Sequence, residues 1–279
     1  MKRIVTAVTL GLLLVACGSH GPSALGPGPS GSPSPTPSSS PSTSPTPFAS
    51  PTPGKPFTFQ IWLTRGGKLF ETMRTEPFVP GVGQLALNDL VAGPTGNEIN
   101  ASVDTAIPHG LAADITFLRS DGEATVRLVV PGLYGVVAPR RIELAQFVYT
   151  LTQYRTISSV VFSTQLGVRY TRASFADLLP QIVVESPVIG ETVSSPVTVS
   201  GMATVFEGVV SLRILDENRN EIAKTFTMAS CFTGCPGDYS TSVKYTVGHE
   251  QPGIVEVYEV SAKDGSAINV QDIPVILKP

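Results

Sequence analysis

The chain has 279 residues, of which 42% are apolar, and its 19 basic and 22 acidic residues leave a formal net charge of −3. This length accommodates one large domain or two ordinary ones, with enough apolar residues for a core. A nucleic-acid-binding protein carries a basic surface, which this charge balance excludes, so we expect no nucleic acid among the partners.

The charge is unevenly distributed along the chain. Residues 57–179 contain ten Lys or Arg and ten Asp or Glu, whereas residues 180–279 contain six and twelve. An acidic surface exposed to water is the ordinary interpretation of this excess. A site for a cation or a basic partner is the alternative.

The first residues have the pattern of an export signal. Lys2 and Arg3 precede an uncharged apolar stretch, residues 4–15, which is too short to span a bilayer. The stretch runs into LVAC, residues 14–17, which resembles a bacterial lipobox, where a small residue precedes a cysteine that becomes lipidated. The alternative is a secretory signal peptide that contains a cysteine by chance.

We therefore expect residues 1–16 to be a lipoprotein signal peptide and Cys17 to become the lipidated N-terminus. Two acyl chains are enough for stable anchoring, whereas a single chain binds a membrane only reversibly. The predicted location is extracytoplasmic, on the outer face of the cell membrane, or on the outer membrane if the cell has one. The predicted partner of Cys17 is membrane lipid.

Residues 17–56 are predicted to be a disordered linker. They consist almost entirely of Pro, Ser, Thr and Gly, and no charged residue occurs between Arg3 and Lys55. Such a composition buries too little apolar surface to offset the entropy of ordering. Its Ser-Pro and Thr-Pro repeats favour extended polyproline II, so the linker could reach on the order of 100 Å.

The linker also contains a literal match to the dinucleotide-binding pattern GxGxxG, from Gly26 to Gly31. That pattern requires a preceding strand and a following helix, and here two prolines occupy its variable positions. We therefore reject a nucleotide site in this segment.

Residues 57–179 are predicted to form an α+β domain, a mixed sheet with helices on one side. The dipeptide Asp121-Gly122 lies between two alternating segments, which is a strong hairpin signal. Five segments have the composition or alternation of strands: residues 57–64, 68–77, 113–120, 123–130 and 157–167. Two segments have helical periodicity: residues 84–92 and residues 140–154, the second opened by Pro139.

The segment LVAGPTG, residues 90–96, is predicted to end the first helix. Gly93 follows the last apolar helical residue, where a left-handed cap is favoured, and Pro94 prevents continuation. A phosphate-binding loop has the opposite order, because its glycines precede a helix. We therefore interpret the segment as a stop signal followed by extended chain.

Four pieces of this domain resemble the GerMN domain, named from sporulation and spore-germination proteins. The pieces are LNDLVAGPT (87–95), AIPHG (106–110), DGEATV (121–126) and ELAQFVYTLTQYRTISSVVFSTQLG (143–167). Their order matches the family, and together they cover essentially all of residues 57–170. The namesake protein carries two such domains in tandem, whereas this sequence has one.

The GerMN resemblance implies a non-catalytic module, often found on envelope lipoproteins, and related folds build protein assemblies outside the membrane. It also implies structural roles for the motif residues Gly93, Pro94, Thr95, Pro108, Gly122 and Gln146.

Residues 180–279 are predicted to form an all-β sandwich. About seven short alternating segments follow one another, turn residues separate them, and helical periodicity is absent. Residues 186–208 resemble the immunoglobulin-like domain of bacterial spore-germination proteins, with Gly201, Phe206 and Glu207 in the matching motif. That family is known by its architecture and not by an established ligand, so the resemblance implies little chemistry.

Cys231 and Cys235 are the local chemical feature of this second domain. In an extracytoplasmic compartment a disulfide is the favoured interpretation, and closing so small a loop contributes about 2 kcal/mol on the chain-entropy model. Free thiols and half of a metal site are the alternatives. A redox pair has CxxC spacing instead, and a zinc site would require two further ligands.

No catalytic pattern is recognisable, and the chain carries no HExxH, GxSxG, SxxK or Walker sequence. The histidines are His20 in the linker, and His109 and His249 in predicted turns, where we expect them to be exposed. Trp62 and Tyr134 could stack on a sugar, although Trp62 in an alternating strand is the pattern of a core residue. No cofactor and no metal site is predicted.

Three functions are consistent with these observations. The favoured one is a non-enzymatic lipoprotein that binds an envelope protein and helps to assemble or regulate an envelope complex. The second is a module that binds cell-wall glycan or peptide, which requires an exposed aromatic platform or a groove. The third is a wall hydrolase, which requires clustered Asp, Glu or His side chains in a cleft.

Overall fold

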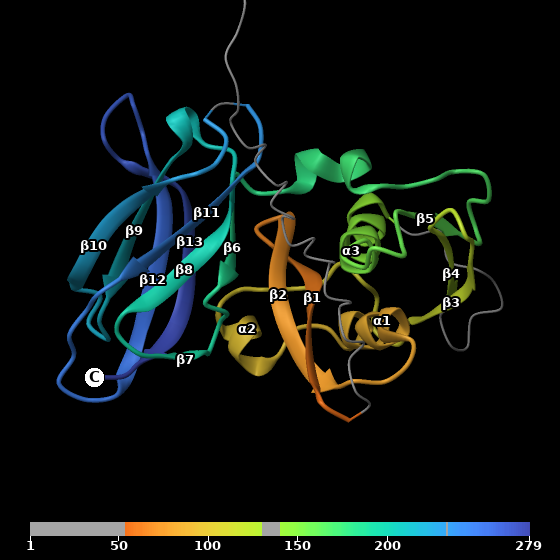
Figure 1. Ribbon diagram of the computed structural model, residues 1–279, viewed down its shortest axis with the longest axis horizontal. Coiled ribbons are helices and arrows are strands. Elements are labelled where there is room, and N and C mark those ends of the chain that lie inside the picture. Colours follow the sequence, from red (N-terminus) through yellow and green to blue (C-terminus); the bar gives the residue numbers. More distant parts are fainter. Residues whose placement is uncertain (1–53, 130–139, 233) are drawn as a thin grey trace, which may run out of the picture. The chain divides into compact units, whose positions relative to one another are not determined.

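The computed structural model describes residues 54–129, 140–232 and 234–279 (Figure 1). The predicted signal peptide, Cys17, nearly all of the linker with its GxGxxG match and His20, Tyr134 and Pro139 lie outside the described residues.

The first part of the described chain mixes strands with helices. In chain order its elements are β1 (Pro56–Arg65), β2 (Lys68–Pro77), α1 (Val82–Ala92), α2 (Gly96–Asn100), β3 (Ala112–Leu118), β4 (Glu123–Val129), α3 (Arg141–Leu151), β5 (Ser159–Phe162) and the 3₁₀ segment η1 (Arg172–Leu178).

The hairpin of β1 and β2 runs in register over the full length of both strands. Arg65 pairs with Lys68, so Gly66 and Gly67 alone form the turn, with φ values of 58° and 77°. Two positive φ values in a two-residue loop are the backbone that matches strand twist, and glycine adopts them without strain.

A second sheet has the order β3-β4-β5, in which β4 pairs antiparallel with β3 and parallel with β5. The helices α1 and α3 pack against each other and against β1. The predicted α+β class with a mixed sheet is therefore confirmed. Its strands are divided between a two-stranded and a three-stranded sheet.

Two predictions in this part are wrong. The strand predicted over residues 157–167 is limited to Ser159–Phe162, because the chain then turns and the Gln165 N–H donates to the carbonyl of Phe162. Extended chain was predicted after Pro94, but α2 begins at Gly96. Thr95 and Glu98 form a capping box, the reciprocal pair that starts a helix.

The second part of the described chain is all β. Its elements are β6 (Ile182–Ser186), β7 (Thr192–Val193), β8 (Val197–Ala203), the 3₁₀ segment η2 (Phe206–Gly208), β9 (Val209–Leu215), β10 (Glu221–Met228), β11 (Gly237–Val243), β12 (Gln251–Val260) and β13 (Ala267–Leu277).

These strands form a sheet of order β10-β9-β12-β13-β7 and a sheet of order β11-β8-β6. The predicted sandwich is confirmed, with eight strands where about seven were expected. The difference arises in residues 192–203, where Pro196 lies between two strands, β7 and β8. Pro196 cannot donate to a ladder, and β7 before it joins β13 while β8 after it joins β6 and β11.

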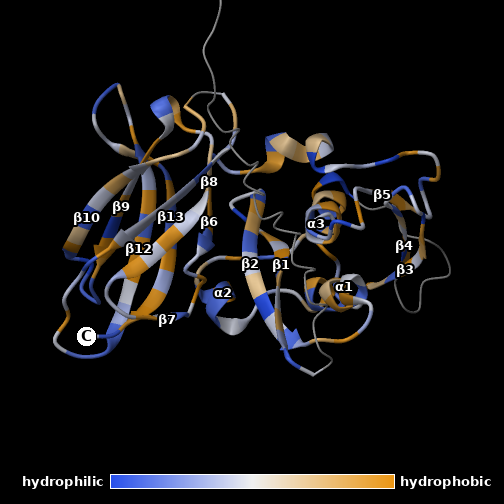
Figure 2. Cartoon of the chain, viewed as in Figure 1, coloured by the Kyte–Doolittle hydropathy of each residue, from blue (hydrophilic) through white to orange (hydrophobic). Residues whose placement is uncertain are grey.

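Apolar residues lie along α1, α3 and the inward faces of the strands (Figure 2). All described residues belong to one compact unit, in which β2 contacts β6. Within the described ranges no helix has the length and apolar character needed to cross a bilayer.

Candidate functional site

The residues Gly93-Pro94-Thr95, which follow α1, lead into a network of hydrogen bonds around a buried carboxylate, that of Glu98. We call this network the Glu98 clamp. Gly93 caps α1 with φ 83°, and its N–H donates to the carbonyls of Asp89 and Leu90, so the predicted helix stop is confirmed. Thr95 then caps α2, with its N–H 2.7 Å from Glu98 Oε2 and its Oγ1 accepting from the Glu98 N–H at 3.4 Å.

Glu98 is 2% exposed and receives further donors from β2. Arg74 donates to Oε1 at 2.9 Å and to Oε2 at 2.7 Å, and the Thr72 hydroxyl donates to Oε1 at 2.6 Å. Burial by itself raises the pKa of a carboxyl, but these donors outweigh it, so the pKa of Glu98 is lowered. The motif therefore fixes α2 to β2 through an ionised side chain.

Sequence reasoning missed Glu98, although a signal was present. The spacing Thr95-x-x-Glu98 is that of a capping box. We interpreted the segment only as the end of one helix and not as the beginning of the next.

Gln146 hydrogen-bonds a backbone group on the edge of β1 that does not pair with β2. Its Nε2 donates to the carbonyl of Trp62 at 2.9 Å, and its Oε1 accepts from the Ala106 N–H at 2.9 Å. Thr150 Oγ1 accepts from the Trp62 N–H at 3.0 Å. In the turn that follows α3, Gln153 bonds both the N–H and the carbonyl of Gln60.

Gln146 and Thr150 lie four residues apart, hence on one face of α3, and Gln153 follows in the turn after the helix. They replace a neighbouring strand, because backbone polar groups at a buried strand edge need partners. The structural role implied for Gln146 is supported by these contacts.

The hairpin residue Gly122 adopts φ 85°, and a Cβ there would lie 2.8 Å from Ser158 Oγ. Its carbonyl accepts from the Ser158 N–H at 2.8 Å, which holds the hairpin against the start of β5. Arg169 pairs with Asp121 and Glu123 on the exposed side of the turn. Asp121-Gly122 thus forms the predicted hairpin turn.

The AIPHG segment, residues 106–110, ends in a tight turn in which the Leu111 N–H donates to the carbonyl of Pro108 at 3.2 Å. His109 in this turn and His249 in the second part are both exposed, as predicted. Trp62 is fully buried, which confirms its interpretation as a core residue and removes it as a platform for sugar.

A buried carboxyl and an arginine lie where β2 approaches β6. Glu71 is 4% exposed, and its Oε1 has no partner among the described residues. Burial, reinforced by repulsion from Glu185 on β6, raises the pKa of Glu71 to about 8, although Arg172 opposes the shift. Arg172 lies over the rings of Tyr149 and Trp62, at 5.0 and 5.7 Å from their centroids. No sequence signal marked this group.

A groove of about 520 Å³, lined by both polar and apolar residues, begins at Leu69 and Phe70, the two residues that precede Glu71 on β2. Arg65 at its wall donates to the carbonyl of Asp272 at 2.9 Å and to Gln271 Oε1 at 2.5 Å, and its guanidinium lies 4.4 Å from the Phe70 ring centroid. Among the described residues, the lining contains two cations and no carboxylate: Arg65, Gly66, Lys68, Leu69, Phe70, Leu179, Pro180, Gln181, Asn269, Val270 and Gln271.

In the sandwich, Gly201 is required by a close approach. A Cβ on Gly201 would lie 2.0 Å from the carbonyl oxygen of Val183 and 2.9 Å from the hydroxyl of Tyr239. That hydroxyl crosses to donate to the Val183 carbonyl at 3.0 Å. Only glycine on β8 leaves room for this bond between β11 and β6, the two strands that flank it.

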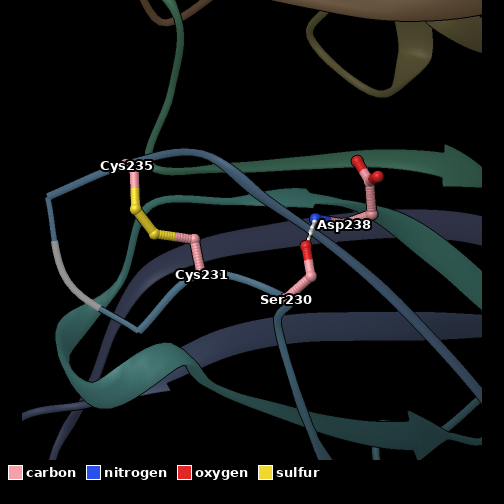
Figure 3. Close-up of a disulfide and its surroundings, with 4 residues drawn as sticks. All are labelled: Ser230, Cys231, Cys235 and Asp238. Atoms are coloured by element: carbon pink, nitrogen blue, oxygen red, sulfur yellow. Dashed lines mark hydrogen bonds between the residues drawn. A yellow bond between two sulfur atoms is a disulfide. The ribbon is translucent and has the colours of Figure 1, made fainter. Parts of the chain in front are cut away.

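The other two motif residues of the sandwich face water. Phe206 is 59% exposed, and Glu207 adopts φ 52° within η2. Near η2, a disulfide joins Cys231 to Cys235 (Figure 3). Phe232 inside this loop is also exposed, at 61%. No group of three or more potential metal ligands occurs in the described part of the chain.

Two family models match the chain. Residues 68–165 match "Sporulation and spore germination", and residues 181–266 match "Immunoglobulin-like domain of bacterial spore germination". Neither model describes an enzyme family. Comparison with curated proteins finds no significant match.

Among solved structures, the chain is similar to the tandem GerMN domains of the sporulation protein GerM from Bacillus subtilis. The identity is 13% and the TM-score 0.33, and the match covers 80% of this chain. The chain spans 61% of the length of that structure. A similarity of this size does not define a shared fold. Two separate parts of this chain are therefore similar to known families, the first to a sporulation and spore-germination domain and the second to the immunoglobulin-like domain of bacterial spore germination.

Proposed function

We propose that this protein is a non-catalytic, lipid-anchored envelope protein that presents two binding domains outside the membrane. Their role is protein–protein interaction in envelope assembly, or in a sporulation- or germination-type process or its regulation. The anchor is Cys17, the spacer is the Pro/Ser/Thr-rich linker of residues 17–56, and the domains are residues 57–179 and 180–279.

One observation carries the proposal: Glu98 and Gln146 of the first domain are engaged within the fold, whereas large aromatic side chains of the second domain face water. Glu98 and Gln146 each bond to two or more neighbouring segments. Phe206, Phe226 and Phe232 of the second domain are all more than half exposed. Exposed aromatic side chains in this number are typical of surfaces that bind other proteins.

The carboxyls of Glu71 and Glu185 both have a raised pKa, but they do not support the alternative of a wall hydrolase. The space beside Glu71 measures about 10 Å³, which admits about one water molecule. A sugar ring cannot reach that carboxyl.

The second candidate is binding of cell-wall glycan or peptide, which the 520 Å³ groove favours. Its amide side chains, such as those of Gln181 and Asn269, could bond sugar hydroxyls, and Arg65 or Lys68 could pair with a wall carboxylate. The groove offers no exposed tryptophan or tyrosine on which a sugar could stack.

Two measurements separate these candidates. Cross-linking of intact cells that carry the tagged full chain should return the same envelope protein in independent repeats. Purified peptidoglycan should not retain the chain in a pull-down. Retention that is lost in a Gln181→Ala, Asn269→Ala double variant would establish wall binding instead. The absence of any reproducible protein neighbour would overturn the main proposal.

A further inference from the structure

We propose that one end of the sandwich is the docking surface for a cationic protein segment that carries an apolar side chain. This surface, the tip surface, consists of Phe206, Glu207, Phe232 and Glu259. The inference rests on the proposed function and deepens it by naming the surface and the chemistry of the partner.

The two phenylalanines of the tip surface come from segments that touch each other. A Cβ on Gly208 in η2 would lie 2.9 Å from the carbonyl oxygen of Cys231 and 3.3 Å from the Cα of Phe232. Phe206 and Phe232 are 59% and 61% exposed, although phenylalanine is normally buried. Two aromatic side chains from adjoining segments of the sandwich therefore face water.

Described residues in or beside each segment are tied to the rest of the sandwich. The disulfide closes the loop that carries Phe232, and Ser230 and Asp238 bond each other twice at its base, each bond 2.9 Å long (Figure 3). The Phe206 N–H donates to Glu259 Oε1 at 2.9 Å. A surface that is ordered in advance loses little entropy on binding, which favours a docking role.

Glu207 supplies an independent observation. It adopts φ 52°, a left-handed conformation that is strained for a residue with a side chain. The neighbouring Gly208 also has a positive φ, 67°. A glycine would therefore fit the backbone at position 207 as well, yet the sequence has a glutamate there. Strained residues of this kind gather at binding sites, where the conformation directs a side chain. Here the residue placed at the tip carries a negative charge.

The charge of the tip surface indicates the partner. Within the described residues neither Glu207 nor Glu259 forms an ion pair, and Glu259 Oε2 accepts only from the neutral amide of Asn269, at 2.7 Å. The surrounding domain, residues 180–279, has six basic and twelve acidic residues. Complementary potentials then favour a partner with Lys or Arg around its apolar side chain, and they disfavour an anionic membrane surface.

The test is selection of random peptides displayed on phage against the purified, immobilised full chain. We expect the selected peptides to combine Lys or Arg with Leu, Ile, Phe or Trp. In fluorescence titrations, Phe206→Ser with Phe232→Ser should weaken a selected peptide at least about tenfold, since aromatic anchors dominate such interfaces. Glu207→Gln and a rise in salt should each weaken it about threefold. Phe117→Ser is the matched control, because Phe117 is a similarly exposed phenylalanine on β3 in the first domain, and it should change nothing.

Each other outcome overturns the inference. Peptides that bind the double variant as well as the parent locate the docking surface elsewhere and leave the proposed function intact. Acidic peptides would contradict the charge argument. Phe206-dependent co-sedimentation with phosphatidylcholine vesicles would identify lipid as the occupant, and Phe206-dependent dimers in sedimentation velocity would identify a second copy. Failure to select any peptide, together with no cross-linked neighbour in cells, would remove the inference and the proposed function together.

Discussion

Arg74 on β2 holds both oxygens of the Glu98 carboxylate on α2, at 2.9 and 2.7 Å, in a site where Glu98 is 2% exposed. Removing one member of a buried pair leaves the other charge without compensation. We expect Glu98→Ala to lower the free energy of unfolding by about 3–5 kcal/mol in urea titrations.

The exposed pair of Arg127 and Asp114 is the control for that experiment, because its side chains are 54% and 46% exposed. Arg127→Ala should cost about 1 kcal/mol or less. Equal losses in the two variants would contradict a structural role for the Glu98 clamp.

Gln146 offers a second test, on the edge of β1. Gln146→Leu conserves size but leaves the Trp62 carbonyl and the Ala106 N–H without their bonds to the amide. Unsatisfied buried groups cost about 1–3 kcal/mol each, so we expect a loss of about 2–4 kcal/mol by chemical denaturation. Asn88→Leu, on the exposed face of α1, is the control and should stay within about 0.5 kcal/mol of the parent. A stability unchanged by Gln146→Leu would mean that the strand edge finds other partners.

Glu71 should make stability depend on pH. Its pKa is raised to about 8 by burial and by Glu185, against about 4.3 in an unfolded chain. The folded state therefore retains a proton that the unfolded state releases. The stability from this group is fully present below about pH 4 and is lost as pH rises toward 8.

The measurement for Glu71 is a series of thermal melts between pH 5 and pH 8. Glu71→Gln should gain about 1–3 kcal/mol relative to the parent over this range, because its amide never ionises. Glu217→Gln, in an exposed turn, is the control and should follow the parent. A parent and a Glu71→Gln variant with parallel pH profiles would refute the buried-proton explanation.

The disulfide between Cys231 and Cys235 can be tested by alkylation followed by mass spectrometry. Alkylation of the unreduced, unfolded chain should leave both cysteines unlabelled, and prior reduction should add two labels. Replacing both by serine should lower the free energy of unfolding by about 2 kcal/mol, because closure of a short loop restricts the unfolded chain. Labelling without reduction would show that the native protein carries free thiols.

The proposed lipidation of Cys17 predicts how the protein partitions between detergent and water. The full chain should enter the detergent phase of a Triton X-114 extraction and incorporate labelled fatty acid, because two acyl chains anchor stably. Cys17→Ser should remove both properties, whereas Cys231→Ser should keep them. A Cys17→Ser variant that remains in the detergent phase would mean that another segment binds the membrane.

Local sequence patterns were sufficient for much of the fold. The Gly66-Gly67 and Asp121-Gly122 hairpins, the end of α1 at Gly93 and the sandwich strands follow from backbone preferences that act within a few residues. The capping box of Thr95 and Glu98 is equally local and was readable, so missing α2 was an error of interpretation.

The sequence by itself determined most of the secondary structure and the domain types, because hydrophobic period and turn chemistry depend on near neighbours. The tertiary structure decided which polar side chains are engaged and which apolar ones are exposed. Arg74 meets Glu98 across 24 residues, and Gln146 meets Trp62 across 84. No periodicity encodes such pairings, because they depend on which elements pack together. For the same reason only the fold placed Phe206 and the Cys231–Cys235 loop at one end of the sandwich.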